Sequence, residues 1–199
     1  MKRTSAAPKH NPNLINVLLA LKKLLDDFGA PWTLIGGVAA AILGKPRFTA
    51  DVDAVILIKD EEISEFIIKA RKYELAPRLA DAEAFAFKNR VILLRHMPSG
   101  IGVDISIGLL PFEIEAINRS KLYKIGNVSI RMPKVEEMII FKAVAHRPQD
   151  MLDIQEMLWL NQKIDKKYLE NQLKEFSAIL ENSAIWDDVK DLLKKKRKL

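Results

Sequence analysis

The chain has 199 residues, enough to bury the core of one compact domain with a helical extension. Apolar residues make up 49% and charged residues 29%, which is typical of a globular protein, and the absence of cysteine excludes disulfides and cysteine-bound metals. The net charge is +6, no apolar run has membrane-spanning length, and no apolar segment follows the N-terminal basic residues, so we expect a cytoplasmic protein without a secretory signal or membrane contact.

The first half of the chain alternates between helical and strand-like patterns. Apolar residues from Leu14 to Phe28 recur at helical spacing and Gly29 follows them, which predicts an amphipathic helix with a defined end. After a flexible lead over residues 1–11, we expect a helix over 13–28, a strand over 32–35, a short helix over 37–43, a loop over 44–50, a strand over 52–58 and a helix over 61–73.

The second half begins with strands and ends in helices. Pro77 is expected to open a helix towards Lys88, because proline is favoured in the first turn. Turn residues at 98–100 and 126–127 indicate two hairpins, with strands over 90–97, 101–107, 121–124 and 127–131. Helices are expected over 110–119, 134–145, 149–160, 166–180 and 183–195. The sequence therefore predicts a mixed α+β fold, with a core over 12–132 and a helical C-terminal region over 133–199.

Residues 36–58 carry the most informative pattern. Gly36 and Gly37 open the short helix, where backbone N–H groups can approach a phosphate closely. Asp51 and Asp53 are two residues apart on the next strand and therefore share one face. Two such carboxylates repel each other unless a cation lies between them, and carboxylate oxygens are suitable ligands for Mg²⁺. The pattern indicates a site for phosphoryl or nucleotidyl transfer.

This pattern resembles the DNA polymerase β-like nucleotidyltransferase superfamily, whose signature is a glycine pair, usually followed by serine, and then Asp-x-Asp on a strand. The spacing of Arg47 and Thr49 is similar to the branch of small stand-alone, type IV toxin and aminoglycoside nucleotidyltransferases. The resemblance implies a nucleotidyltransferase core with a mixed sheet flanked by helices. Val38 departs from it, because a hydroxyl residue usually stands there and contacts the triphosphate; Thr49 can replace that contact only from another direction.

Asp104 lies in an otherwise apolar predicted strand. A buried, unpaired carboxylate is costly, so Asp104 either is solvated at a strand edge beside Gly102 or belongs to a site. The superfamily has a third acidic residue on a later strand, and Asp104 matches that place. The resemblance implies that Asp51, Asp53 and Asp104 hold Mg²⁺ in a one- or two-metal site and are the catalytic residues, with Asp104 activating the acceptor hydroxyl.

A second group of residues is predicted to bind the nucleotide. Arg47 either clamps a phosphate or is a surface arginine. The segment from Lys142 to Asp153 resembles the Lys…Arg-x-x-Asp-x-x-Asp element of the toxin-like branch. Lys142 either snorkels to the surface or reaches a phosphate, and Asp150 either caps a helix or takes part in function. Asp153 is expected to pair with Arg147 or Lys142. The predicted nucleotide-binding residues are Gly36, Gly37, Arg47, Thr49, Lys142 and Asp150.

Together these residues predict Mg²⁺-dependent transfer of a nucleoside monophosphate from an NTP, such as ATP, to a hydroxyl acceptor. An RNA or tRNA end, a protein and a small molecule such as an aminoglycoside remain open as acceptors. The toxin-branch resemblance and the basic tail over 194–198 favour a macromolecular acceptor, a toxin-like role and an antitoxin partner, although a solvated helix end also explains the tail. The alternatives are a catalytically inert nucleotidyltransferase-fold binding module, which Val38 favours, and a structural partner protein with an apolar helical interface.

Overall fold

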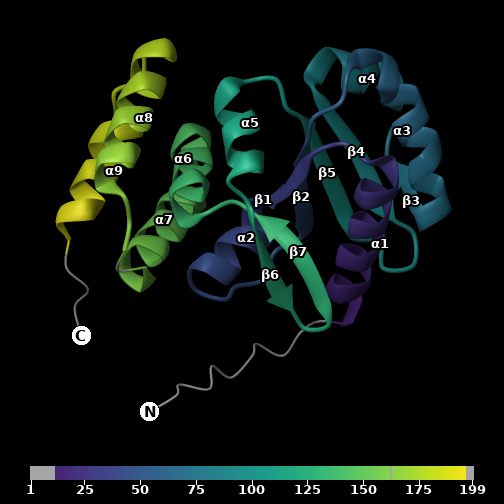
Figure 1. The fold of residues 1–199 in the computed structure, drawn as a ribbon, viewed down its shortest axis with the longest axis horizontal. Helices are drawn as coiled ribbons and strands as arrows, with labels where there is room; N and C mark the ends of the chain where they lie inside the picture. Colours follow the sequence, from purple (N-terminus) through teal and green to yellow (C-terminus); the bar gives the residue numbers. More distant parts are fainter. Residues whose placement is uncertain (1–11, 162, 196–199) are drawn as a thin grey trace. The chain divides into compact units, whose positions relative to one another are not determined.

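A computed structural model defines the fold of residues 12–161 and 163–195 (Figure 1). The predicted lead over residues 1–11 and most of the basic tail lie outside these described residues. The chain forms two units, which we call the sheet unit, residues 12–34 with Phe48–Met132, and the helical unit, Ile35–Arg47 with residues 133–195. The chain therefore leaves the sheet unit after Leu34 and returns to it at Phe48.

The sheet unit combines a five-stranded mixed sheet with helices and a separate hairpin. Its elements are helices α1 (Pro12–Phe28), α3 (Ile63–Ala70), α4 (Ala82–Asn89) and α5 (Pro111–Asn118), short 3₁₀ helices η1 (Asp60–Glu62) and η2 (Arg71–Tyr73), and strands β1 (Trp32–Ile35), β2 (Asp51–Ile56), β3 (Leu75–Pro77), β4 (Val91–His96), β5 (Gly102–Ile107), β6 (Lys121–Ile125) and β7 (Val128–Met132). The sheet has the order β1-β2-β5-β4-β3, and β6 pairs with β7. Strands β2 and β5 run parallel, whereas β4 is antiparallel to both of its neighbours.

Helix α1 contributes a large part of the core of the sheet unit. Its apolar residues repeat at helical spacing and are fully buried: Val17, Leu18, Leu21, Leu24 and Leu25. This face packs against β2, β7 and α3. Burying each of these side chains favours folding by about 2 kcal/mol. The packing of this face, more than helix propensity, therefore holds α1 in place.

The predicted elements of the sheet unit are largely confirmed, with one correction at Pro77. This residue does not open a helix; it ends β3, where it pairs with Leu94 of β4, and the helix α4 begins only at Ala82. Because β3 is one of the two edge strands of the five-stranded sheet, a residue without an N–H group is tolerated there. Three residues of apolar pattern are too few to reveal such a strand in the sequence.

The helical unit contains helices α2 (Gly36–Leu43), α6 (Val135–Ala145), α7 (Pro148–Leu160), α8 (Lys166–Ile179) and α9 (Ala184–Lys194). The last four pack against one another, and α2 packs against α6 and α7. Asn161 donates from Nδ2 to the carbonyl oxygen of Leu43 at 2.8 Å. A Cβ atom on Gly44 would lie 3.2 Å from Cγ of Met157, so this glycine permits the close approach of α2 and α7. Although far away in sequence, α2 is thus anchored on the C-terminal helices.

The mixed α+β fold predicted from the sequence is confirmed. The four predicted C-terminal helices differ from α6, α7, α8 and α9 by no more than one residue at either end. None of the described helices is both long enough and apolar enough to cross a membrane.

Candidate active site

Three carboxylates lie on one face of the five-stranded sheet. Asp51 and Asp53 are the first and third residues of β2, and Asp104 is the third residue of β5. The parallel register pairs Asp53 with Asp104 and Asp51 with Gly102. Because paired residues and residues two apart share a face, the three side chains project from the same side of the sheet. Asp51 is exposed, whereas Asp53 and Asp104 are partly buried.

Gly102 makes room for the carboxylate of Asp51. A Cβ atom at this position would overlap Oδ1 of Asp51 and lie 3.1 Å from its Cγ. It would also lie 3.2 Å from Nη1 of Arg78. Gly102 is not among the glycines with positive φ, so its backbone conformation is open to other residues. The absence of a side chain, and not an unusual backbone angle, is what this position contributes.

Arg78 reaches the carboxylate of Asp104 from the edge of the sheet. It directly follows β3, and its backbone N–H donates to the carbonyl oxygen of Leu93 on β4 at 3.0 Å. Its guanidinium group donates from Nη2 to Oδ1 of Asp104. The two side chains are 24% and 33% exposed, so water screens this ion pair only in part.

The electrostatic surroundings of Asp104 disfavour its charge. Its pKa is raised above the usual carboxyl range, and burial is the largest cause. The charge of Arg78 opposes this effect, and the charges of Asp53 and Asp51 add to it. A cation bound beside this carboxyl group would favour its charged form and so lower its pKa.

The donor set fits a hard divalent cation such as Mg²⁺. Mg²⁺ binds carboxylate oxygens, three of these groups share a face, and Gly102 leaves the space in which the Asp51 carboxylate lies. Across residues 12–161 and 163–195, however, no three acidic, histidine or cysteine side chains are already assembled as a group that could hold a metal ion. One oxygen of the Asp104 carboxylate is engaged by the guanidinium of Arg78.

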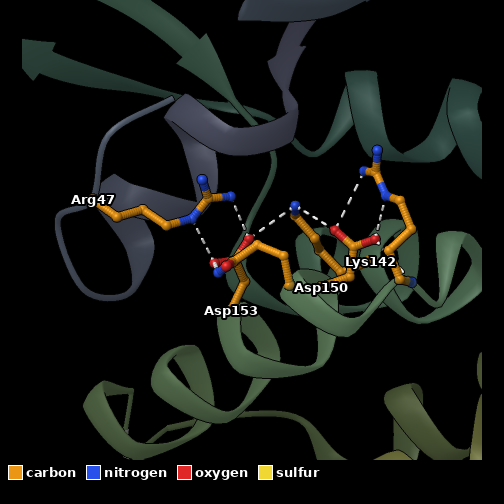
Figure 2. Close-up of polar contacts among 6 residues, drawn as sticks. Arg47, Lys142, Asp150 and Asp153 are labelled. Atoms are coloured by element: carbon orange, nitrogen blue, oxygen red, sulfur yellow. Dashed lines mark hydrogen bonds and ion pairs between the residues drawn. The ribbon is translucent and has the colours of Figure 1, made fainter. Parts of the chain in front are cut away.

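A second cluster, the ion network, joins Arg47 to α6 and α7 within the helical unit (Figure 2). Arg47 donates from Nε and Nη2 to the two carboxylate oxygens of Asp153, at 2.8 and 2.7 Å. Lys142 Nζ lies 3.0 Å from Oδ2 of Asp153 and 2.7 Å from Oδ1 of Asp150. Arg147 donates from Nε to Oδ2 of Asp150 at 2.7 Å, and its backbone N–H donates to the same oxygen at 3.1 Å. Positive and negative side chains thus alternate, with one cation in excess.

The centre of the ion network is buried. Lys142 is 4% exposed, Asp150 is 1% exposed and Asp153 is 7% exposed. Burial raises the pKa of both aspartates, but hydrogen bonds from their basic neighbours outweigh it, so the pKa of each lies below its usual value. Lys142 therefore does not snorkel to the surface; it is bound between two carboxylates that remain charged.

The other predicted nucleotide-binding residues lie around α2 and the loop that follows it. Gly36 and Gly37 are the first two residues of α2, and Gly36 has a φ of 70°, which favours glycine at this turn out of β1. Val38 is buried in the same helix. Thr49 lies partly exposed in the loop before β2. The structure brings Asp51, Asp53 and Asp104 together in the sheet unit, and Arg47, Lys142 and Asp150 together in the helical unit.

Three contacts were not predicted from the sequence. The role of Gly102 beside Asp51 has a local signal, a glycine two residues before an aspartate on the same strand. The contact between Arg78 and Asp104 has no local signal, because Arg78 follows the edge strand β3 and Asp104 lies on the central strand β5, 26 residues away in sequence. The pairing of Asp153 with Arg47 was also missed, whereas its pairing with Lys142 was among the expected alternatives.

Comparison with protein families gives one match over most of the chain. The sequence profile described as nucleotidyltransferase of unknown function (DUF6036) matches residues 13–197. None of the curated proteins matches the sequence.

Several solved structures share the fold. The antibiotic-resistance factor ANT(2'')-Ia superimposes with a TM-score of 0.61 at 12% identity, covering 86% of this chain and 95% of that one. An antigenic nucleotidyltransferase-like protein from Paracoccidioides brasiliensis has a TM-score of 0.55 at 17% identity, covering 94% of each chain. The lincosamide antibiotic adenylyltransferase LnuA, in its lincomycin-bound form, has a TM-score of 0.50 at 14% identity, covering 76% of this chain and 98% of that one. At these identities the similarity is one of fold.

Proposed function

The chain belongs to the family of nucleotidyltransferases of unknown function (DUF6036), and from this membership we propose that it transfers a nucleoside monophosphate from an NTP to a hydroxyl acceptor. The observation that supports this proposal most directly is the register of β2 and β5. It places Asp51, Asp53 and Asp104 on one face of the sheet, with Asp53 and Asp104 directly paired. Such a concentration of negative charge is unfavourable in an inert domain and useful in a site that binds cations.

We assign metal binding to the carboxylates of Asp51, Asp53 and Asp104. Their oxygen atoms are the donor type that Mg²⁺ prefers, and their strands hold them on one face. When bound there, Mg²⁺ would neutralise negative charge on the triphosphate and on the departing pyrophosphate. Gly102 keeps open the space for the Asp51 carboxylate.

The proposed reaction is a single displacement at the α-phosphorus of the NTP. The acceptor oxygen forms a bond to this phosphorus, and the bond from the phosphorus to the oxygen that bridges to the β-phosphate breaks. Pyrophosphate leaves with that bonding electron pair. Asp104 accepts the proton of the acceptor hydroxyl, a role for which a partly buried carboxylate on a rigid strand is suited.

Nucleotide contacts are assigned to residues around α2 and in the ion network. Gly36 and Gly37 offer backbone N–H groups to phosphate oxygens at the start of α2. Arg47 has a partly exposed side chain that Asp153 holds by two hydrogen bonds, so its guanidinium is oriented before a phosphate binds. Thr49, Lys142 and Asp150 are also assigned to nucleotide binding; Lys142 and Asp150 are buried and paired with each other, so they act through Asp153, which holds Arg47.

The solved structures that share the fold suggest which classes of acceptor to test. ANT(2'')-Ia has been solved in complex with adenylyl-2''-tobramycin, and LnuA with lincomycin, so hydroxyl groups of antibiotics are one class to test. An RNA end and a protein hydroxyl are the others, and either would accord with a toxin-like role and an antitoxin partner.

The experiment is a transfer assay with each of the four NTPs, radiolabelled at the α-phosphate, in the presence of Mg²⁺. Total tRNA, the protein itself and a panel of aminoglycosides and lincosamides are added in turn. We expect label transfer by the wild type and none by an Asp51→Asn/Asp53→Asn variant. Asp81→Asn, an exposed carboxylate of the sheet unit outside β2 and β5, is the matched control and should retain transfer. NTP binding without transfer to any acceptor would favour an inert binding module, and no NTP binding would refute the proposal.

A further inference from the structure

Arg78 lies in one row with the paired aspartates of the candidate active site. Its backbone N–H binds the carbonyl oxygen of Leu93, Leu93 is paired with Asp104, and Asp104 is paired with Asp53. The row therefore crosses the sheet from beyond β3, over β4, to β5 and β2. The Arg78 side chain spans β4 to reach Asp104, which places a permanent positive charge on the face that carries the carboxylates.

The guanidinium group is close to two of the three carboxylates. Nη2 donates to Oδ1 of Asp104. Nη1 lies 3.2 Å from the point above Gly102 where a Cβ atom would stand, and Oδ1 of Asp51 borders the same point. A cation shared by Asp51 and Asp104 would need oxygen atoms that face this space. The guanidinium and a divalent ion therefore compete for the same side of the site.

From this geometry we propose that Arg78 is a built-in competitor of the metal: it holds Asp104 in an ion pair that a divalent cation must break. The inference rests on the proposed function, because it concerns the carboxylates to which metal binding is assigned. The arrangement stabilises the metal-free protein, in which three carboxylates on one face would otherwise repel one another. It also lowers the affinity for a metal ion, since the ion can bind the carboxylate of Asp104 only when the ion pair with Arg78 is broken.

The test measures Mn²⁺ binding to the full-length, metal-free protein by the electron paramagnetic resonance signal of free Mn²⁺. Arg78→Gln removes the competing charge and keeps a polar side chain of similar length. We expect it to bind Mn²⁺ about three- to tenfold more tightly than the wild type, an effect in the lower part of the range of coupling between residues in direct contact. We also expect the melting temperature of metal-free Arg78→Gln to be lower than that of the wild type, and to rise more when Mn²⁺ is added.

Two further variants make the test specific. Arg95→Gln removes the same charge from an exposed position that is paired with Gly102 on the same face. It should change Mn²⁺ affinity much less, and an equal change in the two variants would show a general field effect and overturn the proposal. In an Asp104→Asn background, Arg78→Gln should leave Mn²⁺ affinity unchanged, because the contact that it removes is already lost.

The remaining outcomes separate this inference from the proposed function. Mn²⁺ binding that depends on Asp51 and Asp53 but is unchanged or weakened in Arg78→Gln would overturn the competition and leave the metal site intact. If the wild type and Asp51→Asn/Asp53→Asn bind Mn²⁺ equally well, or if neither binds it, both the competition by Arg78 and the proposed metal site are refuted. If Arg78→Gln does not give the circular dichroism spectrum of a folded protein, Arg78→Lys is the substitute, because it keeps the positive charge but lacks the guanidinium group. We expect the Mn²⁺ affinity of Arg78→Lys to lie between those of the wild type and of a protein without the charge. An affinity equal to that of the wild type would count against the proposal.

Discussion

Gly102 on β5 and Asp51 on β2 occupy paired positions, and the carboxylate of Asp51 lies in the space that the absence of a side chain on Gly102 leaves. Two residues further along both strands, the same register pairs Asp104 with Asp53. The parallel pairing of two short strands therefore determines both which carboxylates are neighbours and how much room they have. This relationship leads to the first prediction.

Gly102→Ala is expected to lower Mn²⁺ affinity by about tenfold or more, the usual effect of disturbing the support of a metal ligand. The added methyl group overlaps Oδ1 of Asp51 and must displace that carboxylate. Stability should change by less than about 1 kcal/mol, because the Asp51 side chain is exposed and can move. Mn²⁺ titration and urea unfolding measure the two effects. Ser106→Ala, on the same strand and face, is the control, and equal affinities in the two variants would contradict the prediction.

Asp153→Asn is expected to lower the free energy of unfolding by about 3 kcal/mol, the magnitude typical of removing one partner from a buried ion pair. Asp153 accepts hydrogen bonds from Arg47 and lies 3.0 Å from Lys142, so the substitution leaves two cations short of a partner. Urea unfolding followed by circular dichroism gives the value. The exposed pair of Asp191 and Lys194 supplies the control: Asp191→Asn should leave stability unchanged. If the free energy of unfolding falls no more in Asp153→Asn than in Asp191→Asn, the ion network does not stabilise the fold.

The ion network also predicts how stability depends on pH. The pKa values of Asp150 and Asp153 are lowered in the folded protein, because hydrogen bonds from basic neighbours outweigh the effect of burial. Their contribution is therefore complete above the unfolded carboxyl pKa of about 4 and is lost as the pH falls through the folded values.

We therefore expect the urea midpoint of the wild type to decrease as the pH is lowered from about 5 to about 3, and to decrease less steeply in Asp150→Asn/Asp153→Asn. Urea unfolding at a series of pH values measures both slopes. Asp81→Asn, which leaves the ion network intact, should retain the slope of the wild type. Parallel curves for the double variant and the wild type would disprove the assignment of this acid sensitivity to the network.

Thr33→Val is expected to destabilise the sheet unit by about 1 kcal/mol, the usual contribution of a buried hydrogen bond. Thr33 is fully buried on β1, and its Oγ1 lies 2.7 Å from Oγ of Ser120, which in turn donates to the carbonyl oxygen of Ala116 at 2.7 Å. Valine has a similar shape but lacks the hydroxyl group, so Ser120 loses this partner. Thermal unfolding measures the change, and Thr33→Ser, which retains the hydroxyl, should lose less stability than Thr33→Val. The reverse order would show that the methyl group, and not the hydrogen bond, matters at this position.

The sequence predicted most of the secondary structure, because the relevant signals are local. The spacing of Val17, Leu21 and Leu24 identifies α1, and the turn at Gly126 identifies the hairpin of β6 and β7. The strand β3 was missed because it is short and ends in Pro77, a residue that reads equally well as the start of a helix. The spacing of Asp51 and Asp53 likewise predicted that they share a face, while their metal-binding and catalytic roles remain predictions.

By itself, therefore, the sequence determined most of the elements other than β3, which side chains share a face of one element, and the family to which the chain belongs. The tertiary structure alone decided that Asp104 is paired with Asp53, that Arg78 reaches it over β4, and that Arg47 is bound by Asp153, a residue 106 positions away. The reason is physical. Periodicity reports the geometry of one helix or one strand, whereas strand register and ion pairing depend on which distant segments bury their apolar faces against one another.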